Sequence, residues 1–254
     1  MAKLIVLGSS NAIPTQGHEN THFVFRIPGR IILVDCGPNP IVRLEQVSID
    51  PCQVTDIFLT HFHPDHTASL PLFLMDLWLM KRKQSLTIYG LDYTIDRVEA
   101  MMDLYGWREW SGLFEIKLVR IPSAKKIIAL EDDSLRVSAS PVKHFIPNIC
   151  LRFDLKQEKK SFAYSSDTEP CQAVVEISRD VDILIHECAN TPGHSSAAQA
   201  GEIAQKAGAR SLYLIHYPGN ISNGEDMLVK ASQTYPGPVK LALDFMEIAL
   251  EADL

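Results

Sequence analysis

Residues 60–66 read Thr-His-Phe-His-Pro-Asp-His and gather four side chains that commonly bind metals. Imidazole and carboxylate are the nitrogen and oxygen ligands that zinc, manganese and iron accept in proteins. Within a loop, His61 and His63 can point the same way to hold one metal, while Asp65 and His66 can hold another. The alternative is a histidine-rich surface loop that binds metal only adventitiously.

Three further side chains of these types occur much later in the chain. They are His144, Asp167 and His216, and each stands at the end of a mainly apolar run that is typical of a strand. A single histidine in such a place is more often structural. Ligands that come from separate strand ends, however, would form a preformed site on a rigid scaffold.

The elements that must hold these side chains are predicted by the pattern of apolar residues and turns. Strands dominate the middle of the chain and helices occur in both halves, which is typical of a layered α/β or α+β protein. The pattern leaves open a sandwich with helices outside and a doubly wound sheet. Strands are expected at Leu4–Leu7, His22–Ile27, Arg30–Asp35, Asp56–Thr60, Leu86–Tyr89, Phe114–Arg120, Lys126–Leu130, Leu135–Ser140, Ile149–Leu155, Ser161–Ser165, Asp182–His186, Ser211–His216 and within Val239–Ala249. Helices are expected at Pro40–Val47, Ala68–Lys81, Tyr93–Tyr105, Ser195–Ala207 and Gly224–Thr234.

Composition argues against several functional classes. The 254 residues are 46% apolar and 22% charged, and no apolar run approaches the ~20 residues of a membrane span. A net charge of −7 provides no long-range basic field for nucleic acid. The five cysteines include no Cys-x-x-Cys pair, so neither a disulfide framework nor a thiolate zinc site is expected. We therefore expect a cytoplasmic protein without a membrane partner.

The His-x-His-x-Asp-His motif, followed by a distant His, Asp and His, resembles the metallo-β-lactamase superfamily. Two further features resemble its ribonuclease Z group. The opening Leu-Gly-Ser-Ser-Asn-Ala-Ile-Pro is similar to the glycine-rich start of that group. The segments His186-Glu187-Cys188-Ala189 and His194-Ser195-Ser196 are similar to its His-Glu-Ala and His-Ser-Thr boxes. The similarity extends from residue 4 to residue 217.

This resemblance implies an α+β fold, an αββα sandwich that forms a single domain over residues 1–254. It also implies two divalent metal ions, with zinc favoured and manganese, nickel or iron as alternatives. Asp35, at another strand end, would orient a ligand imidazole, unless it is a plain turn aspartate. By likeness to the family, His61, His63 and His144 would hold the first metal, Asp65, His66 and His216 the second, and Asp167 would bridge them.

The resemblance also suggests how the site would act. Two cations can lower the pKa of a shared water and neutralise charge on a phosphoryl oxygen. Asp65 would orient that water and accept its proton. His194 would serve as the general acid or contact a phosphate oxygen, with its tautomer set by Glu187. The alternative for His194 is a place in a Gly-His-Ser-Ser helix cap, in which a serine does the capping.

One departure from the ribonuclease Z pattern bears on the substrate. Members that mature tRNA carry a long basic arm between the positions that match His144 and Asp167, whereas here the interval is 23 residues (167 − 144). We therefore expect a small or nucleotide-type phosphodiester as substrate, and no extended grip on tRNA. The alternatives are a hydrolase of lactones, thioesters, sulfate esters or β-lactams, and a metal-bearing carrier protein without catalysis.

Within the helix predicted at Ala68–Lys81, the segment Leu70–Met80 is apolar nearly all round. Such a helix is either deeply buried or covered by a partner. Together with the family resemblance, this pattern favours a homodimer.

Overall fold

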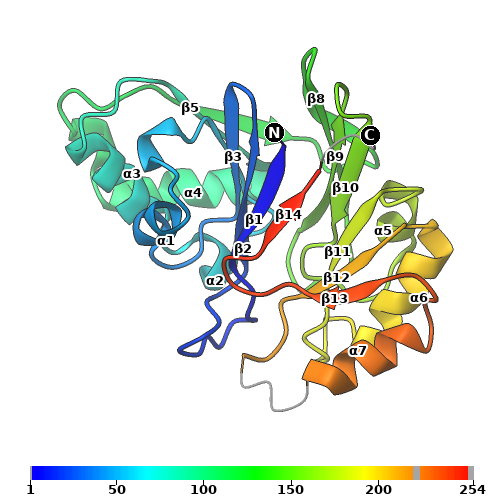
Figure 1. The fold of residues 1–254 in the computed structure, drawn as a ribbon. Coiled ribbons are helices and arrows are strands. Elements are labelled where there is room, and N and C mark those ends of the chain that lie inside the picture. Colours follow the sequence, from blue (N-terminus) through cyan, green and yellow to red (C-terminus); the bar gives the residue numbers. More distant parts are fainter. Residues whose placement is uncertain (1, 220–223, 251–254) are drawn as a thin grey trace.

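Two mixed sheets lie face to face in the computed structural model, which describes residues 2–219 and 224–250 (Figure 1). Within these residues each sheet has seven strands. The first has the order β14 (Glu247–Ala249), β1 (Lys3–Gly8), β2 (His22–Ile27), β3 (Arg30–Val34), β4 (Asp56–Phe58), β5 (Leu86–Leu91) and β6 (Ile116–Ile121). The second has the order β13 (Val239–Leu241), β12 (Leu212–Ile215), β11 (Ile183–Glu187), β10 (Lys160–Tyr164), β9 (Ile149–Leu155), β8 (Leu135–Pro141) and β7 (Ile127–Glu131).

Helices cover the outer face of each sheet, because the parallel strands need crossover connections. Figure 1 shows one group of helices beside the first sheet and another beside the second. The first group is α1 (Pro40–Gln46), α2 (Pro64–Thr67), α3 (Leu70–Leu79) and α4 (Asp92–Leu104), with the short 3₁₀ turns η1 (Pro51–Gln53) and η2 (Trp107–Glu109). The second group is α5 (Gln172–Ile177), α6 (Ala197–Ala207) and α7 (Gly224–Ser232). The result is the αββα sandwich that the sequence analysis expected.

Three apolar layers follow from this arrangement. A central layer joins the inner faces of the two sheets, and an outer layer lies under the helices on each side. In the central layer, Phe25 of β2 meets Phe162 of β10 edge to face at 5.0 Å, and Phe162 stacks on Phe153 at 4.4 Å. Because both faces of each sheet are covered, strands such as β1 are almost continuously apolar.

The structure corrects several predicted boundaries. The helix expected at Ala68–Lys81 is shorter and corresponds to α3, and a separate single-turn helix, α2, precedes it. The Thr67 hydroxyl at the end of α2 donates to the carbonyl of His63. The strand expected at Asp56–Thr60 ends at Phe58, because the chain turns there to present the histidines. The closing segment forms two strands in different sheets, β13 and β14.

Helix α3 is not deeply buried, so that alternative was wrong. Its inner face packs into the core, but Leu72 and Leu79 on the other face are each 55% exposed. None of the helices in the described ranges is long and apolar enough to cross a lipid bilayer.

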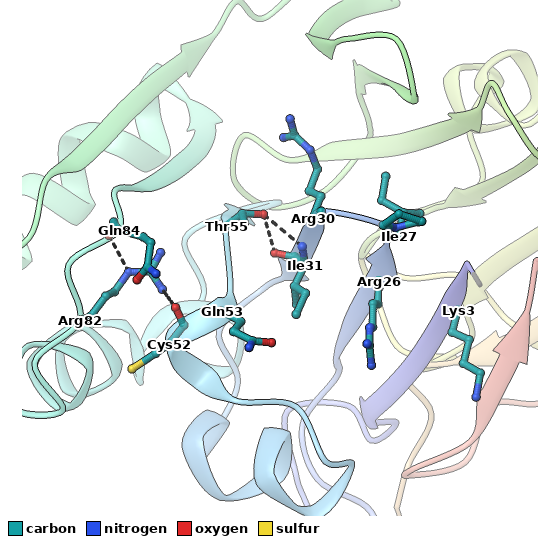
Figure 2. Close-up of a pocket in the computed structure, with 12 residues that line it drawn as sticks. Lys3, Arg26, Ile27, Arg30, Ile31, Cys52, Gln53, Thr55, Arg82 and Gln84 are labelled. Carbon is teal, nitrogen blue, oxygen red and sulfur yellow. Dashed lines mark hydrogen bonds between the residues drawn. The ribbon is translucent and has the colours of Figure 1, made fainter.

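A cavity of about 740 Å³ lies at the amino ends of the parallel strands β3 and β4 (Figure 2). Basic side chains line it, yet they do not converge on one point: Arg30 extends away from Arg26 and Lys3. Arg30 is also bound by two carboxylates, those of Asp56 and Asp132, at 2.9 and 2.8 Å. Asp35 and His61 follow the opposite, carboxyl ends of these two strands.

Candidate metal centre

Strand ends from both sheets meet at one edge of the sandwich. His61 follows β4, and Asp167 and His216 follow β10 and β12, so the carboxyl ends of parallel strands face one another across the two sheets. The structure brings all seven predicted ligands together in two groups, and within each group the candidate ligand atoms lie within 4.8 Å of one another. Their role as metal ligands stays a prediction.

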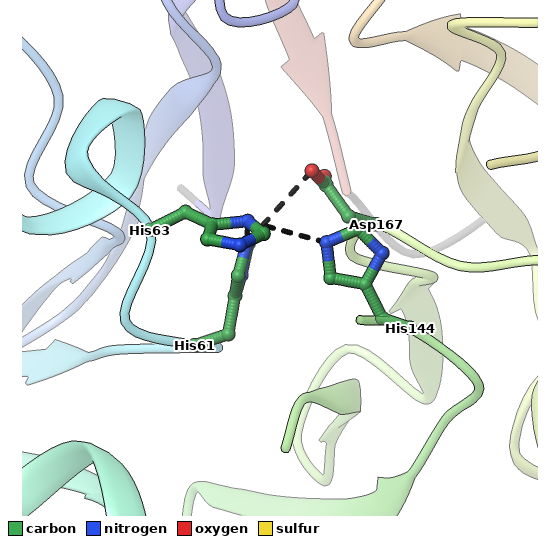
Figure 3. A group of neighbouring side chains, drawn as sticks. All are labelled: His61, His63, His144 and Asp167. Carbon is green, nitrogen blue, oxygen red and sulfur yellow. Dashed lines mark hydrogen bonds and ion pairs between the residues drawn. The ribbon is translucent and has the colours of Figure 1, made fainter. Parts of the chain in front are cut away.

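The first group consists of His61, His63, His144 and Asp167, whose side chains point toward one another in Figure 3. Nδ1 of His63 lies 3.0 Å from Nε2 of His61 and 3.2 Å from Nε2 of His144. The other nitrogen of His144, Nδ1, is 3.0 Å from the Gly193 carbonyl, to which it donates. Nε2 of His144 therefore carries a lone pair that points at the other imidazoles, as a cation site requires.

The second group consists of Asp65, His66, Asp167 and His216. Nε2 of His66 lies 3.3 Å from the carboxylate of Asp65, and Nε2 of His216 lies 3.1 Å from that of Asp167. His66 comes from α2, a single turn that begins with Pro64 and places Asp65 and His66 side by side. The short helix therefore directs the side chains of Asp65 and His66 toward the second sheet.

Asp167 belongs to both groups. Its Oδ2 atom lies 3.1 Å from His216, 3.5 Å from His66 and 3.8 Å from His61, measured to Nε2 in each case. Its other oxygen, Oδ1, is buried without a hydrogen-bond partner, as are Nε2 of His66 and Nδ1 of His216. Unpaired buried polar atoms are costly, about 1–3 kcal/mol each. Their concentration here fits a centre that binds cations.

The electrostatics of the cluster agree with this fit. Burial, followed by the charge of His66, holds the pKa of His61 well below its usual value, and burial also lowers the pKa of His63 and His144. Burial alone would raise the pKa of Asp167, but the neighbouring His216 and His66 hold it well below its usual range. Neutral imidazoles and ionised carboxylates are the forms that bind metals.

Negative charge is also in excess around His66. Although burial opposes its charged form, the carboxylates of Asp65, Asp167 and Asp35 raise its pKa well above the usual value. In the described part of the chain, the ion pairs that Asp65, Asp167 and Asp35 form are all with histidines, never with Lys or Arg. A bound cation would compensate these carboxylates.

Asp35 is a buried carboxylate that holds neighbouring residues of the centre in place through hydrogen bonds. Its Oδ2 accepts a hydrogen bond from Nδ1 of His66 at 2.8 Å, which orients that ring as the sequence analysis expected. Its Oδ1 accepts from the backbone N–H of Thr60 at 2.8 Å. Thr60, which the sequence analysis had given no role, also contacts Nδ1 of His61 at 3.0 Å. One buried carboxylate therefore helps to position two rings.

His194 and Glu187 form a second unit beside the histidines. Nδ1 of His194 lies 3.0 Å from Oε1 of Glu187, and the ring lies 5.0 Å from that of His144. Fully buried Glu187 also accepts hydrogen bonds from the backbone N–H groups of Thr168, Ser195 and Ala189. Burial would lower the pKa of His194, but its hydrogen bond to Glu187 and the charge of that carboxylate raise it.

Helix capping does not require His194. Ser196 is the N-cap residue of α6 and forms a reciprocal capping box with Gln199. The histidine is therefore free to act elsewhere, although its catalytic role stays a prediction.

Asn148 is a supporting residue that the sequence analysis missed. Its Nδ2 donates to the carbonyl of Asp167 at 2.7 Å, and its Oδ1 accepts from the Ser166 hydroxyl at 2.9 Å. A polar residue at the start of an apolar strand was the available signal, but its partner lies 19 residues away. Asn148 thus holds the loop that presents Asp167.

The remaining histidines lie outside the two groups. His22 and His186 are fully buried elsewhere, and burial lowers the pKa of His22 to about 4. His18 bonds the Ser9 hydroxyl at 2.9 Å and meets Tyr217 edge to face.

Comparison with known proteins identifies relatives over the whole chain. The model of the beta-lactamase superfamily domain matches residues 30–217. A ribonuclease Z from Methanothermobacter thermautotrophicus is 26% identical over 308 aligned positions, which cover 99% of this chain and 98% of the relative.

Solved structures share the fold. The metallo-beta-lactamase fold protein YhfI from Bacillus subtilis superimposes with a TM-score of 0.83 at 21% identity, over 97% of this chain and 98% of that one. The short form of human tRNase Z superimposes with a TM-score of 0.81 at 23% identity, over 98% and 99%.

Proposed function

The chain belongs to the beta-lactamase superfamily, and from that premise we propose that it is a binuclear metal-dependent phosphodiesterase. Its substrate would be a small or flexible phosphodiester, such as a cyclic or nucleotide-type ester. The curated relatives named ribonuclease Z support phosphodiesters over lactones, thioesters or sulfate esters.

The observation that carries the proposal is the position of Asp167. One of its oxygens lies within 3.8 Å of imidazole nitrogens from both ligand groups. A carboxylate shared by both groups would serve as a ligand in each of them, which supports a site for two ions. Zinc is favoured and manganese, nickel or iron are alternatives, because the nitrogen and oxygen donors suit all four.

Two such ions would supply an activated water and neutralise charge on the phosphoryl oxygens. The protein's own residues would do the rest. Asp65, which lies partly exposed beside His66, would orient the water and accept its proton. Glu187 fixes the ring of His194 through Nδ1, so Nε2 remains to pass a proton to the leaving oxygen.

The form of the chain between His144 and Asp167 supports a small substrate. This interval folds into the hairpin of β9 and β10, and no arm projects from it. The alignment with the ribonuclease Z from Methanothermobacter thermautotrophicus spans 308 positions against 254 residues here, so that relative has at least 54 positions that this chain lacks (308 − 254).

Metal analysis and a substrate comparison test the proposal together. After reconstitution with zinc or manganese, we expect close to two ions per chain and hydrolysis of bis(p-nitrophenyl) phosphate well above that of a lactone or a thioester. Processing of a precursor tRNA should be poor. Metal content near zero, or faster turnover of the lactone or thioester, would contradict the proposal. Efficient, site-specific removal of a tRNA 3′ trailer would contradict the assigned substrate size.

We also propose a homodimer located in the cytoplasm. The exposed apolar face of α3, with Leu72 and Leu79, supports a self-contact, and the five unpaired cysteines suit a reducing compartment. Light scattering should give twice the chain mass, and Leu72→Glu should shift it to that of a monomer. A monomeric wild type would contradict the dimer.

A further inference from the structure

Phe145 follows His144 directly and is 66% exposed. Its ring centroid lies 5.2 Å from that of His144 and 6.4 Å from that of His194. A large aromatic side chain therefore lies at the rim of the centre, beside both a predicted ligand and the predicted proton donor. Most of its surface remains open to solvent.

The backbone opposite Phe145 is shaped to receive its ring. Gly193 has a φ of +80°, and a Cβ atom at this position would overlap the outer carbons of the Phe145 ring. The same glycine accepts the hydrogen bond of His144 through its carbonyl oxygen. The positive φ and the close approach of the ring both favour glycine at position 193.

The loop that carries Phe145 is also held at both ends. Lys143 accepts a hydrogen bond from the N–H of Glu169 at 2.8 Å and pairs with the carboxylate of that residue. Val142 and Asn148 close the loop through a backbone hydrogen bond of 3.0 Å. Phe145 is thus held by fixed backbone, as a recognition residue requires.

The geometry points to Phe145 as a stacking surface for the nucleobase of a phosphodiester substrate. This inference rests on the proposed function and specifies its substrate class. A phosphate at the metal centre would place the base, one sugar further away, beside the exposed ring. Stacking of a base on an aromatic side chain changes affinity by about 5- to 150-fold and tolerates any base, because every base has a π-face.

Binding of two matched ligands tests the inference without turnover. AMP and ribose 5-phosphate carry the same phosphate and sugar and differ by the base. With the zinc-loaded protein, calorimetry should give a dissociation constant for AMP about 5- to 150-fold below that for ribose 5-phosphate. This ratio should fall toward one in Phe145→Ala and Phe145→Leu, and should persist in Phe145→Trp.

Tyr105→Ala is the control, because it removes an aromatic side chain of similar exposure at the end of α4. It should keep the wild-type ratio, and thermal unfolding should show that the Phe145 variants are folded. Equal affinity for both ligands in the wild type, failure of both to bind, or an unchanged ratio in Phe145→Ala would overturn the stacking role. Hydrolysis of bis(p-nitrophenyl) phosphate by the same sample would leave the proposed function standing, and its absence would overturn that function as well.

Discussion

His66 and Arg82 are polar side chains buried at opposite ends of the first sheet, and they differ in how many of their polar atoms have hydrogen-bond partners within the chain. Arg82, 4% exposed, donates hydrogen bonds to the carbonyls of four residues between positions 52 and 85. Figure 2 shows two of these contacts. His66, fully buried, has one ring nitrogen on Asp35 and another without a hydrogen-bond partner, facing the carboxylates of Asp65 and Asp167.

The difference separates a structural polar group from one that we propose to act in a metal centre. Arg82 finds all its partners within the chain, so its burial stabilises the fold. Around His66, carboxylate charges are uncompensated and buried polar atoms lack hydrogen-bond partners. A bound cation would compensate the charges and pair with these atoms. Backbone strain is also found around His66, since Asp35, Ser166 and His216 all adopt left-handed conformations.

The largest effect on turnover should come from Asp167→Ala. Both ligand groups then lose their shared carboxylate, so we expect phosphodiester hydrolysis to fall by more than about 10³-fold while the fold stays intact. Hydrolysis rates and metal content measure the damage to the centre, and circular dichroism shows whether the fold is intact. Asp154→Ala, on β9, removes a carboxylate far from the centre and should act as wild type. Wild-type hydrolysis by Asp167→Ala would show that this carboxylate has been misassigned.

His194→Ala should follow, with a loss of about 10²–10⁴-fold in kcat and with both metals retained, because this ring is assigned to the leaving group. The loss should be smaller for p-nitrophenyl esters than for alkyl esters, since p-nitrophenolate needs little protonation. Equal losses for both kinds of ester would favour phosphate binding over proton donation.

Ser196→Ala is the matched control for His194. It removes the cap of α6 and should lower the free energy of unfolding by about 0.5–2 kcal/mol without slowing turnover. The opposite pattern, a destabilised His194→Ala with normal kcat, would assign the histidine to the helix end.

Asp35→Asn should weaken zinc binding by about 10- to 100-fold, because the amide cannot hold the Nδ1–H of His66 as strongly as the carboxylate does. Competition with a chelator measures this affinity. Asp56→Asn is a matched change of a buried aspartate, paired with Arg30 at the other end of the sheet. It should lower stability and leave zinc affinity unchanged. Equal zinc affinities in the two variants would remove the distinction between the regions.

Arg82→Ala should have the smallest effect on turnover and a clear effect on stability. Four carbonyls lose their donor, so the free energy of unfolding should fall by about 2–4 kcal/mol in urea titrations, with zinc content unchanged. The exposed neighbour Lys83 provides the control, and Lys83→Ala should stay within about 0.5 kcal/mol of wild type. Loss of zinc from Arg82→Ala would show that the two ends of the sheet are coupled.

Much of the centre could be predicted because its signals are local. Residues 60–66 place four candidate ligands within seven positions, and His144, Asp167 and His216 stand beside apolar runs that fold as strands. The strands and most helices were predicted for the same reason, since apolar periodicity and turn residues act over a few positions. The sequence by itself therefore determined most strands and helices and which side chains stand at their ends, although the helix α5 was not predicted.

Only the tertiary structure decided which ends meet. Asn148 contacts the Asp167 loop, and the Phe145 ring packs against Gly193, so both contacts join segments that are distant in sequence. The strands β13 and β14 are neighbours in sequence but belong to different sheets. The left-handed conformations of Asp35, Ser166 and His216 likewise could not be located from residue type, because most Asp, Ser and His residues have negative φ even though Asp and His are enriched in this region. Such features depend on how the two sheets pack together. That packing decides which buried polar atoms find a hydrogen-bond partner from a distant segment and which do not.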